Sequence, residues 1–223
     1  MSNGKICEPV KEVPIVEEAD VVVIGGGPGG LPAAVASARQ GAKTVLIERY
    51  GVFGGLATTC FMGPLFGYAP FGYFSYHSEG ARPILGGIPV EIIKRLQEIG
   101  GAPDDSELDW QSIRFDPELF KFVCDDMVVG AKIIPFLHSW VVATIVEDRK
   151  IKGVIIESKS GRQAITGKMF IDATGDGDVA FFSGCSYTKG RGADGAMLAF
   201  GSRFRIGGMR ERTKEEIEKC IEL

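Results

Sequence analysis

Glycines near the start of the chain have the spacing with which a protein backbone approaches a pyrophosphate. The segment Asp20–Gly30 reads DVVVIGGGPGG, so Gly25, Gly27 and Gly30 directly follow a short apolar run. The first glycine permits a tight turn, the second lets the backbone approach the anion, and the third lets a following helix lie close to a sheet. That helix's N-terminus, with unpaired N–H groups and a positive dipole end, can hold the anion without a basic side chain.

An acidic residue stands where this pattern needs a ribose ligand. Glu48 ends a second apolar run, Lys43–Ile47, and lies eighteen residues after Gly30. A carboxylate at that point can accept hydrogen bonds from both hydroxyls of an adenosine ribose, and it repels a 2′-phosphate. The pattern therefore predicts a βαβ unit that binds FAD or NAD rather than NADP. A glycine turn without a ligand is the alternative, because the chain contains 31 glycines in 223 residues.

The elements that position these residues follow from hydrophobic periodicity and from turn residues. We expect helices at 33–40, 89–99 and 116–129, and β segments at 21–24, 43–47, 133–137, 141–147, 151–158, 163–166 and 168–171. Asp116 is the expected N-cap of the third helix, and a turn at 148–150 joins two alternating segments into a hairpin. The last segment runs into DATGDGDVA at 172–180, a second strand, glycine turn and helix that we expect to supply another nucleotide contact.

Two segments beyond the first βαβ unit are unusual in composition. Gly54–Gly55 weakens any regular element and permits close backbone approach, so we expect a second ligand contact there. The stretch 60–76 holds seven aromatic residues among glycines and prolines, and we expect an aromatic loop over 60–80 that packs over the cofactor. A satellite hydrophobic cluster or a subunit contact is the alternative. Residues 1–18 are expected to form a surface tail without chemistry.

Composition excludes several classes of partner. The net charge of −4 comes without any basic run, so we expect neither nucleic acid nor a membrane surface as a partner. The five cysteines are scattered and form no CxxC pair, so neither a disulfide framework nor a zinc or iron–sulfur site is expected. The N-terminus has no signal-peptide pattern and no apolar run approaches about 18 residues. We therefore expect a soluble cytoplasmic protein without a metal.

The combined motifs resemble a known family. The glycine fingerprint, ERYGVFGGLAT at 48–58, the β-meander and DATGDGD at 172–178 occur in this order in FAD-dependent oxidoreductases with the glutathione-reductase-type FAD domain. The chain is similar to these proteins over 16–208, including relatives of the flavin domain of heterodisulfide reductase A subunits. The resemblance implies an α/β fold: a Rossmann-like FAD-binding domain over 19–185, with a parallel sheet and an inserted β-meander, and the start of an incomplete substrate-binding domain over 186–223.

The resemblance also implies which residues contact FAD. The pyrophosphate would lie near Gly25, Gly27, Pro28, Gly29 and Gly30, the adenosine ribose near Glu48, and the pyrophosphate and flavin near Gly54, Gly55, Leu56, Ala57 and Thr58. Arg49 is a further expected cofactor-binding residue. The adenosine side would be lined by Val142, which would meet adenine through its backbone, and by Ala173, Thr174 and Gly175. Asp178 would cap the helix that follows.

The sequence departs from the family pattern in two respects. Family members continue to a C-terminal strand and helix that hold the ribityl chain and the isoalloxazine, whereas this sequence reaches a strand-like stretch at 196–206 and a capping box at Thr213–Glu216. We therefore expect either that a second polypeptide supplies the missing half or that the chain is truncated. The second departure is the lack of cysteine spacing for the iron–sulfur ligation that the heterodisulfide reductase comparison suggests.

No catalytic group stands out, because flavin chemistry belongs to the cofactor. Cys60 follows the glycine doublet and is a candidate for redox work, with a structural thiol as the alternative. His77 is a candidate proton donor, with a hydrogen-bonded loop histidine as the alternative. Arg203, with Arg191 and Arg205, could bind a carboxylate substrate or serve a surface role.

The sequence therefore predicts an FAD-dependent oxidoreductase core. It would transfer hydride or electrons between a small organic substrate and the flavin. The alternative is a noncatalytic FAD- or NAD-binding fragment, or one subunit of a split flavoenzyme.

Overall fold

Strands that are buried on both faces form the centre of the sheet. In the computed structural model, which describes residues 4, 9–66, 86–104, 112–204 and 207–208, β2 (Thr44–Ile47) is buried throughout. β1 (Ile15–Ile24) ends in three buried residues and pairs with β2 in parallel. Continuous apolar runs of this kind are typical of parallel sheets that are covered on both sides. Because α1 (Gly30–Arg39) connects the two strands, the predicted first βαβ unit is confirmed.

The sheet has six strands in the order β5-β2-β1-β8-β7-β6. The first four in this order, from β5 (Ile134–Phe136) to β8 (Gly161–Asp172), run parallel to one another. β8 then pairs antiparallel with β7 (Lys150–Ser158), and β7 pairs antiparallel with β6 (Trp140–Glu147). The structure thus confirms the expected α/β fold with a largely parallel sheet and a β-meander.

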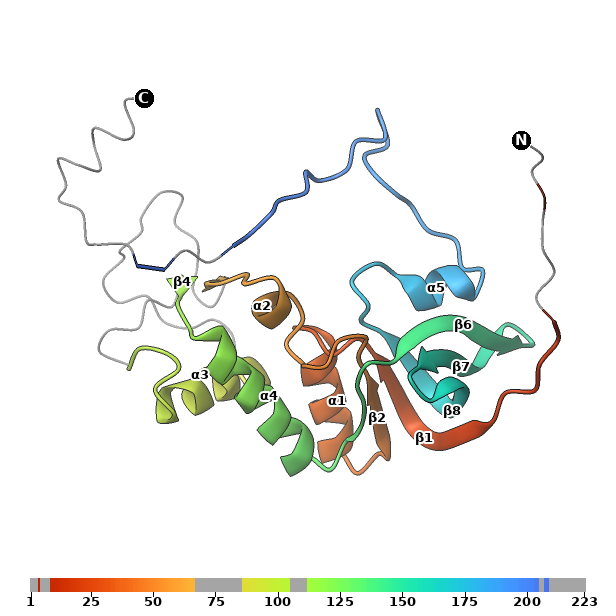
Figure 1. The fold of residues 1–223 in the computed structure, drawn as a ribbon, viewed down its shortest axis with the longest axis horizontal. Coiled ribbons are helices and arrows are strands. Elements are labelled where there is room, and N and C mark those ends of the chain that lie inside the picture. The colour runs from red at the N-terminus through yellow and green to blue at the C-terminus, as the bar shows by residue number, and fades with distance from the viewer. Residues whose placement is uncertain (1–3, 5–8, 67–85, 105–111, 205–206, 209–223) are drawn as a thin grey trace.

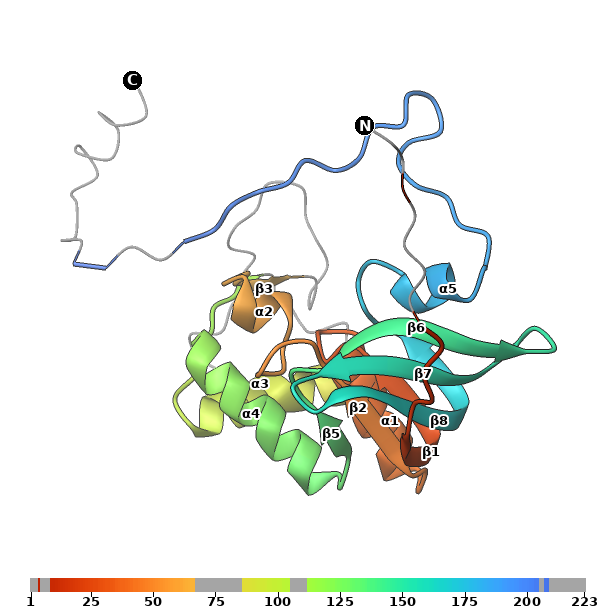
Figure 2. The ribbon, with the colours of Figure 1, turned by 45° about the vertical axis from the view of Figure 1, so that its right-hand side comes forward.

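Two apolar layers lie on opposite faces of β1 and β2. Figures 1 and 2 show α1, α3 (Ile88–Glu98) and α4 (Pro117–Gly130) on one side and the meander on the other. Val23 packs in the layer with the helices, whereas its neighbour Val22 packs in the layer with the meander. This alternation follows from the two-residue period of a strand. The two layers hold the carboxyl ends of the strands in fixed positions.

The expected turn and helix-cap chemistry is present. The side chain of Asp116 accepts hydrogen bonds from the backbone N–H groups of Glu118 and Leu119, at 2.7 and 3.3 Å, and so caps α4 as predicted. The hairpin between β6 and β7 turns through Asp148 and Arg149, which both have positive φ angles of 48° and 60°. Two consecutive residues in this conformation are typical of the two-residue turn that matches strand twist.

Some expected boundaries are wrong. The break expected between 163–166 and 168–171 does not exist, because β8 is one continuous strand over Gly161–Asp172. A tight turn at 159–160 joins β7 to this strand. Gly167 lies inside β8 where this strand meets β1, and a Cβ there would stand 2.8 Å from Cγ2 of Val22. The expected tail over 1–18 also ends early, since β1 begins at Ile15 and its first residues pair with β8.

The remaining described segments are short. α2 (Leu56–Thr59) follows the glycine doublet, β3 (Leu65–Phe66) pairs with β4 (Ser112–Ile113), and α5 (Asp178–Phe182) follows β8. Most of the expected aromatic loop lies at 67–85, outside the described residues, as does the helix expected from Thr213.

In the described part of the chain, no helix or strand follows α5. Figures 1 and 2 show residues 186–204 as a trace that turns back on itself once, and a backbone hydrogen bond from the N–H of Arg191 to the carbonyl of Ala196 closes this turn. The strand expected over 196–206 is absent from its described part, 196–204. None of the helices in the described ranges combines the length and apolar character that a membrane span requires.

Candidate dinucleotide site

A cavity of about 540 Å³ lies where the carboxyl ends of β1, β2 and β8 meet. Ile24, Ile47 and Asp172, the last residues of these three strands, all line it. From β1 the chain crosses to β2 on one side, whereas β8 pairs on the other side of β1. This is the point where the strand order reverses, and ligands of open α/β sheets bind in the crevice there.

The glycines of the loop differ in how much room their neighbours leave for a side chain. Gly25 has a φ of +99°, and a Cβ there would lie 2.3 Å from the carbonyl oxygen of Ala173. A Cβ on Gly30 would lie 1.7 Å from the carbonyl oxygen of Gly25. At Gly27, by contrast, the nearest atom to a Cβ would be the Cα of Gly55, at an ordinary contact distance of 3.6 Å. The fold therefore requires glycine at Gly25 and Gly30, whereas at Gly27 it leaves room for a Cβ.

The N-terminus of α1 points its first turn at the cavity. Gly27, Pro28 and Gly29 line the cavity, and Gly29 is the N-cap of the helix, without any side-chain cap. No acidic side chain lies in the first turn of α1. Because the first amides of a helix lack intrahelical acceptors and carry the positive end of its dipole, this end of the cavity suits a pyrophosphate.

Glu48 is buried at the end of β2, with 5% of its surface exposed, and lines the cavity. Its Oε2 accepts a hydrogen bond from the backbone N–H of Gly26 at 2.7 Å, and its Oε1 accepts one from the N–H of Tyr50 at 2.9 Å. A carboxylate has about four acceptor positions, so each oxygen can still accept a ribose hydroxyl. Glu48 therefore also holds the glycine loop against the end of β2, a role that the sequence pattern did not indicate.

The glycine doublet packs directly against the glycine loop. The N–H of Gly54 donates to the carbonyl of Gly26 at 2.8 Å, and a Cβ on Gly55 would lie 2.7 Å from the Cα of Gly27. Gly55 and Leu56 line the cavity. Four residues that we expected near the cofactor do not line the cavity. They are Gly30 of the glycine loop and Gly54, Ala57 and Thr58 of this second turn.

Gly54, Ala57 and Thr58 instead contribute to the packing of the second turn beside the cavity. The Thr58 hydroxyl donates to the carbonyl of Phe53 at 2.8 Å, and a Cβ on Gly54 would lie 2.5 Å from Cγ2 of Thr58. Ala57 is buried in the layer that packs against the helices. The requirement for small or hydroxyl side chains here comes from packing within the protein.

The second glycine turn is held by a threonine. The Thr174 hydroxyl donates to Oδ1 of Asp172 at 2.8 Å and accepts from the N–H groups of Gly177 and Asp178 at 3.0 and 3.1 Å. Gly177 is the N-cap of α5 and has no side-chain cap bond. The expectation that Asp178 caps this helix is therefore wrong, because the hydroxyl one turn earlier already accepts these donors.

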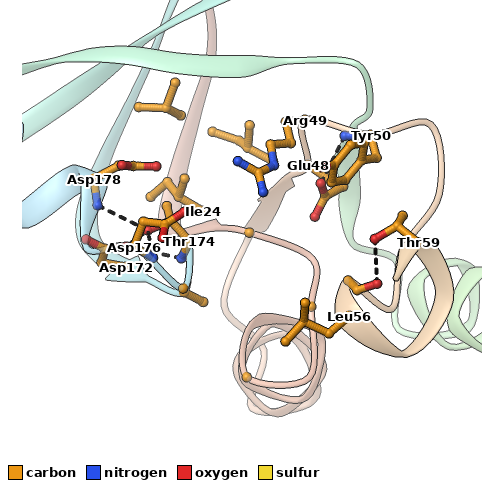
Figure 3. Close-up of a pocket in the computed structure, with 18 of the residues that line it drawn as sticks. Ile24, Glu48, Arg49, Tyr50, Leu56, Thr59, Asp172, Thr174, Asp176 and Asp178 are labelled. Carbon is orange, nitrogen blue, oxygen red and sulfur yellow. Dashed lines mark hydrogen bonds between the residues drawn. The ribbon is translucent and has the colours of Figure 1, made fainter. Parts of the chain in front are cut away.

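Carboxylates form one wall of the cavity. Asp172, Asp176 and Asp178 line it together with Ala173, Thr174 and Gly175. Burial raises the pKa of Asp178, the charges of Asp176 and Asp172 raise this pKa further, and the charge of Arg49 lowers it. Figure 3 shows Arg49 projecting between this wall and the Glu48–Tyr50 side of the cavity. An acidic wall repels phosphate, so it favours the α1 end for an anion.

The start of the meander contributes residues that the sequence pattern did not single out. Ser139, Trp140 and Val141 line the cavity, whereas Val142, expected at the adenine, does not. The side chain of Trp140 is 56% exposed. The hydrophobic pattern alone could not place this tryptophan, because its position depends on how β6 crosses from β5 to the far edge of the sheet.

The three catalytic candidates have different surroundings. Cys60 is exposed and lines the cavity, with its Sγ 3.7 Å from the hydroxyl of Thr59. His77 lies outside the described residues, and Arg203 is exposed and does not line the cavity. Arg191 pairs with Asp194. Within the ranges that the structure describes, no group of three histidine, cysteine or acidic side chains could hold a metal ion.

Several known proteins are similar to this chain. Thiamine thiazole synthase of Methanococcus vannielii is 32% identical over 166 residues, which are 71% of this chain and 56% of that protein. Dihydrolipoyl dehydrogenase of Trypanosoma brucei brucei is 36% identical over 90 residues, or 38% of this chain and 19% of that protein. The crystal structure of THI4 from Thermovibrio ammonificans has the same fold over 74% of this chain and 61% of its own, with a TM-score of 0.52 and 21% identity.

These relatives differ in length from this sequence, which spans little more than half of the first and about a fifth of the second. The sequence model of the FAD-dependent oxidoreductases, by contrast, matches residues 20–222, nearly the whole of the chain. The chain belongs to the FAD-dependent oxidoreductase family.

Proposed function

We propose that the cavity holds the adenosine diphosphate part of FAD and that the chain uses the flavin to transfer hydride or electrons to or from a small organic substrate. The observation that carries this proposal is the room for a Cβ at Gly27. The fold tolerates a side chain at this position, so a ligand that lies against the loop is the physical reason for glycine. The matching anion site at the N-terminus of α1 supports the same conclusion.

The residues of the cavity fit the adenosine diphosphate part of this cofactor. The amides at the start of α1 would hold the pyrophosphate, and Glu48 would accept hydrogen bonds from the ribose. The volume of about 540 Å³ lies within the range of small-molecule sites. FAD supplies the redox chemistry when bound, and the chain binds and orients it.

The experiment compares Gly27→Ala with Gly130→Ala in the full chain. Gly130 is the exposed last residue of α4, and a Cβ there meets nothing within 4 Å, so this variant controls for the added methyl group. We expect Gly27→Ala to weaken FAD binding about tenfold or more, which is about 1.4 kcal/mol, while its unfolding free energy stays close to that of wild type. Equal FAD affinity in both variants by calorimetry would show that no pyrophosphate lies against Gly27.

Redox activity is tested separately on the FAD-loaded chain. Anaerobic addition of small organic reductants should bleach the visible absorbance of bound flavin, with saturation in the reductant concentration. A loaded chain that no substrate reduces, although dithionite does, would support FAD binding without the oxidoreductase activity.

A second candidate function follows from the exposed apolar side chains after α5. Leu198 and Phe200 are 100% and 99% exposed, and Met197 and Phe204 are 63% and 76% exposed. Large exposed apolar patches mark interaction sites. In this second candidate function, the chain is the FAD-binding subunit of a split flavoenzyme, and a second polypeptide supplies the other part. Full FAD occupancy and turnover of the chain alone would exclude it.

A further inference from the structure

One group of three side chains in the cavity contains a guanidinium and two aromatic rings. The guanidinium carbon of Arg49 lies 5.0 Å from the ring centroid of Tyr50 and 5.6 Å from that of Trp140. All three residues line the cavity. The two rings hold the flat guanidinium within cation–π distance. Arg49 and Trp140 thus present planar groups to the ligand space.

Backbone contacts place this group on the far side of Glu48 from the glycine loop. The carboxylate of Glu48 accepts from Gly26 in the loop, whereas its carbonyl accepts from the N–H of Ser139 at 3.0 Å, directly before Trp140. The N–H of His138 donates to the carbonyl of Tyr50 at 3.0 Å. Glu48 therefore lies between the pyrophosphate end and Trp140.

This order along the cavity matches the order of groups in an adenosine diphosphate. With the pyrophosphate at α1 and the ribose at Glu48, the base reaches Arg49 and Trp140. Figure 3 shows the Arg49 side chain directed into the space between Glu48 and the turn that carries Asp178. Bases stack on tryptophan rings and on guanidinium planes. An exposed tryptophan beside an arginine is the chemistry that such a base needs.

We propose that Arg49 and Trp140 form a stacking platform for the adenine of FAD and make the site prefer a purine. The proposal rests on FAD binding at this cavity and adds the residues that recognise the base. Arg49 acts here through its plane rather than through its charge. A role as a phosphate ligand would instead depend on the positive charge alone, which lysine keeps.

The first test uses the fluorescence of Trp140. The chain has two tryptophans, so Trp110→Phe leaves Trp140 as the only one. ADP is the probe, because a flavin would quench tryptophan at a distance by energy transfer. We expect ADP to quench Trp140 emission with saturation, and with the same apparent dissociation constant that calorimetry gives.

The second test measures base preference in the full chain by calorimetry with ADP and UDP. Wild type should bind ADP about five times more tightly than UDP or better, because a purine offers the larger stacking surface. Trp140→Leu, Arg49→Met and Arg49→Lys should each reduce this ratio to about twofold or less. Phe122→Leu, a change at a 60% exposed aromatic residue of α4 away from the cavity, should leave the ratio unchanged.

The outcomes separate this proposal from the FAD assignment. If FAD and ADP bind but the ratio survives in Trp140→Leu and Trp140 emission does not change, the platform is refuted while FAD binding stands. If Arg49→Lys keeps both ADP affinity and the ratio, Arg49 acts by charge and the stacking role is refuted. If wild type binds neither FAD nor ADP, both proposals are refuted.

Discussion

At the scale of single residues, Glu48 combines a structural and a binding task. Its two carboxylate oxygens accept hydrogen bonds from the N–H groups of Gly26 and Tyr50, and the residue also lines the cavity. Removing the side chain leaves a buried donor at Gly26 without a partner. A loss of affinity in a Glu48 variant therefore mixes the lost ribose contact with a disturbed glycine loop.

Glu48→Ala should lower the free energy of unfolding by about 1–3 kcal/mol, the cost of leaving a buried donor unsatisfied. Chemical denaturation measures this change. Glu147→Ala, at an exposed position of the hairpin, is the control and should have little effect. Equal stability of Glu48→Ala and wild type would mean that water replaces the carboxylate without loss.

The ribose contact is measured separately by changing the ligand. Wild type should bind ADP about 10- to 100-fold more tightly than 2′-deoxy-ADP, because the hydroxyl donates to a charged acceptor. In Glu48→Ala this preference should disappear, whatever the stability of the variant. A preference that persists in the variant contradicts the assignment of Glu48 to the ribose.

At the scale of elements, an ion-pair network joins the three helices on one face of the sheet. Glu91 of α3 accepts from both terminal nitrogens of Arg39 in α1, at 2.6 and 2.7 Å, and pairs with Arg95 in its own helix. Arg95 also pairs with Asp126 of α4. The hydrogen bond from Arg39 is the main cause that lowers the pKa of Glu91 below 4.5, and the bond from Arg95 lowers it further.

A lowered carboxyl pKa means that the network stabilises the fold above pH 4.5 and loses this contribution as the pH falls through the folded-state pKa. Glu91→Gln should therefore cost about 1 kcal/mol or less at neutral pH, since the side chains are partly exposed. The cost should shrink as the pH drops below 4.5. Urea unfolding over this pH range checks the trend.

The control for this prediction is Glu118→Gln, which removes an ion pair with Lys121 within one helix. It connects no two elements and should have a smaller effect at every pH. A cost for Glu91→Gln that does not depend on pH contradicts the electrostatic origin.

At the scale of the whole molecule, the described segment after α5 exposes several large apolar side chains. Leu198 and Phe200 are almost fully exposed in an extended segment. If this segment is a contact for another polypeptide, the chain alone should bind hydrophobic dyes and self-associate, and its FAD content should be substoichiometric.

The double substitution Leu198→Glu and Phe200→Glu should reduce dye binding and shift the chain toward the monomer. Sedimentation velocity at several concentrations measures the shift. FAD binding should persist in this variant, because neither substituted residue lines the cavity. Leu56, an exposed apolar residue that does line it, is unchanged. A wild-type chain that is monomeric, fully loaded with FAD and active alone would contradict the need for a partner.

The sequence by itself determined the parts of the site that depend on local signals. The glycine loop, the helix after it and the carboxylate at Glu48 could be predicted, because each follows from backbone geometry or from an apolar period over a few residues. The cap at Asp116 and the hairpin at Asp148–Arg149 are local in the same sense and are present.

Only the tertiary structure decided what depends on neighbours far apart in the chain. From the sequence we expected the strand to be interrupted at Gly167. In the structure β8 is continuous, and that glycine lies against Val22 of β1. Trp140 reaches the cavity because the segment before it binds to the end of β2. Which of the three fingerprint glycines leaves room for a ligand depends on Ala173 and Gly55, and no local pattern contains these contacts.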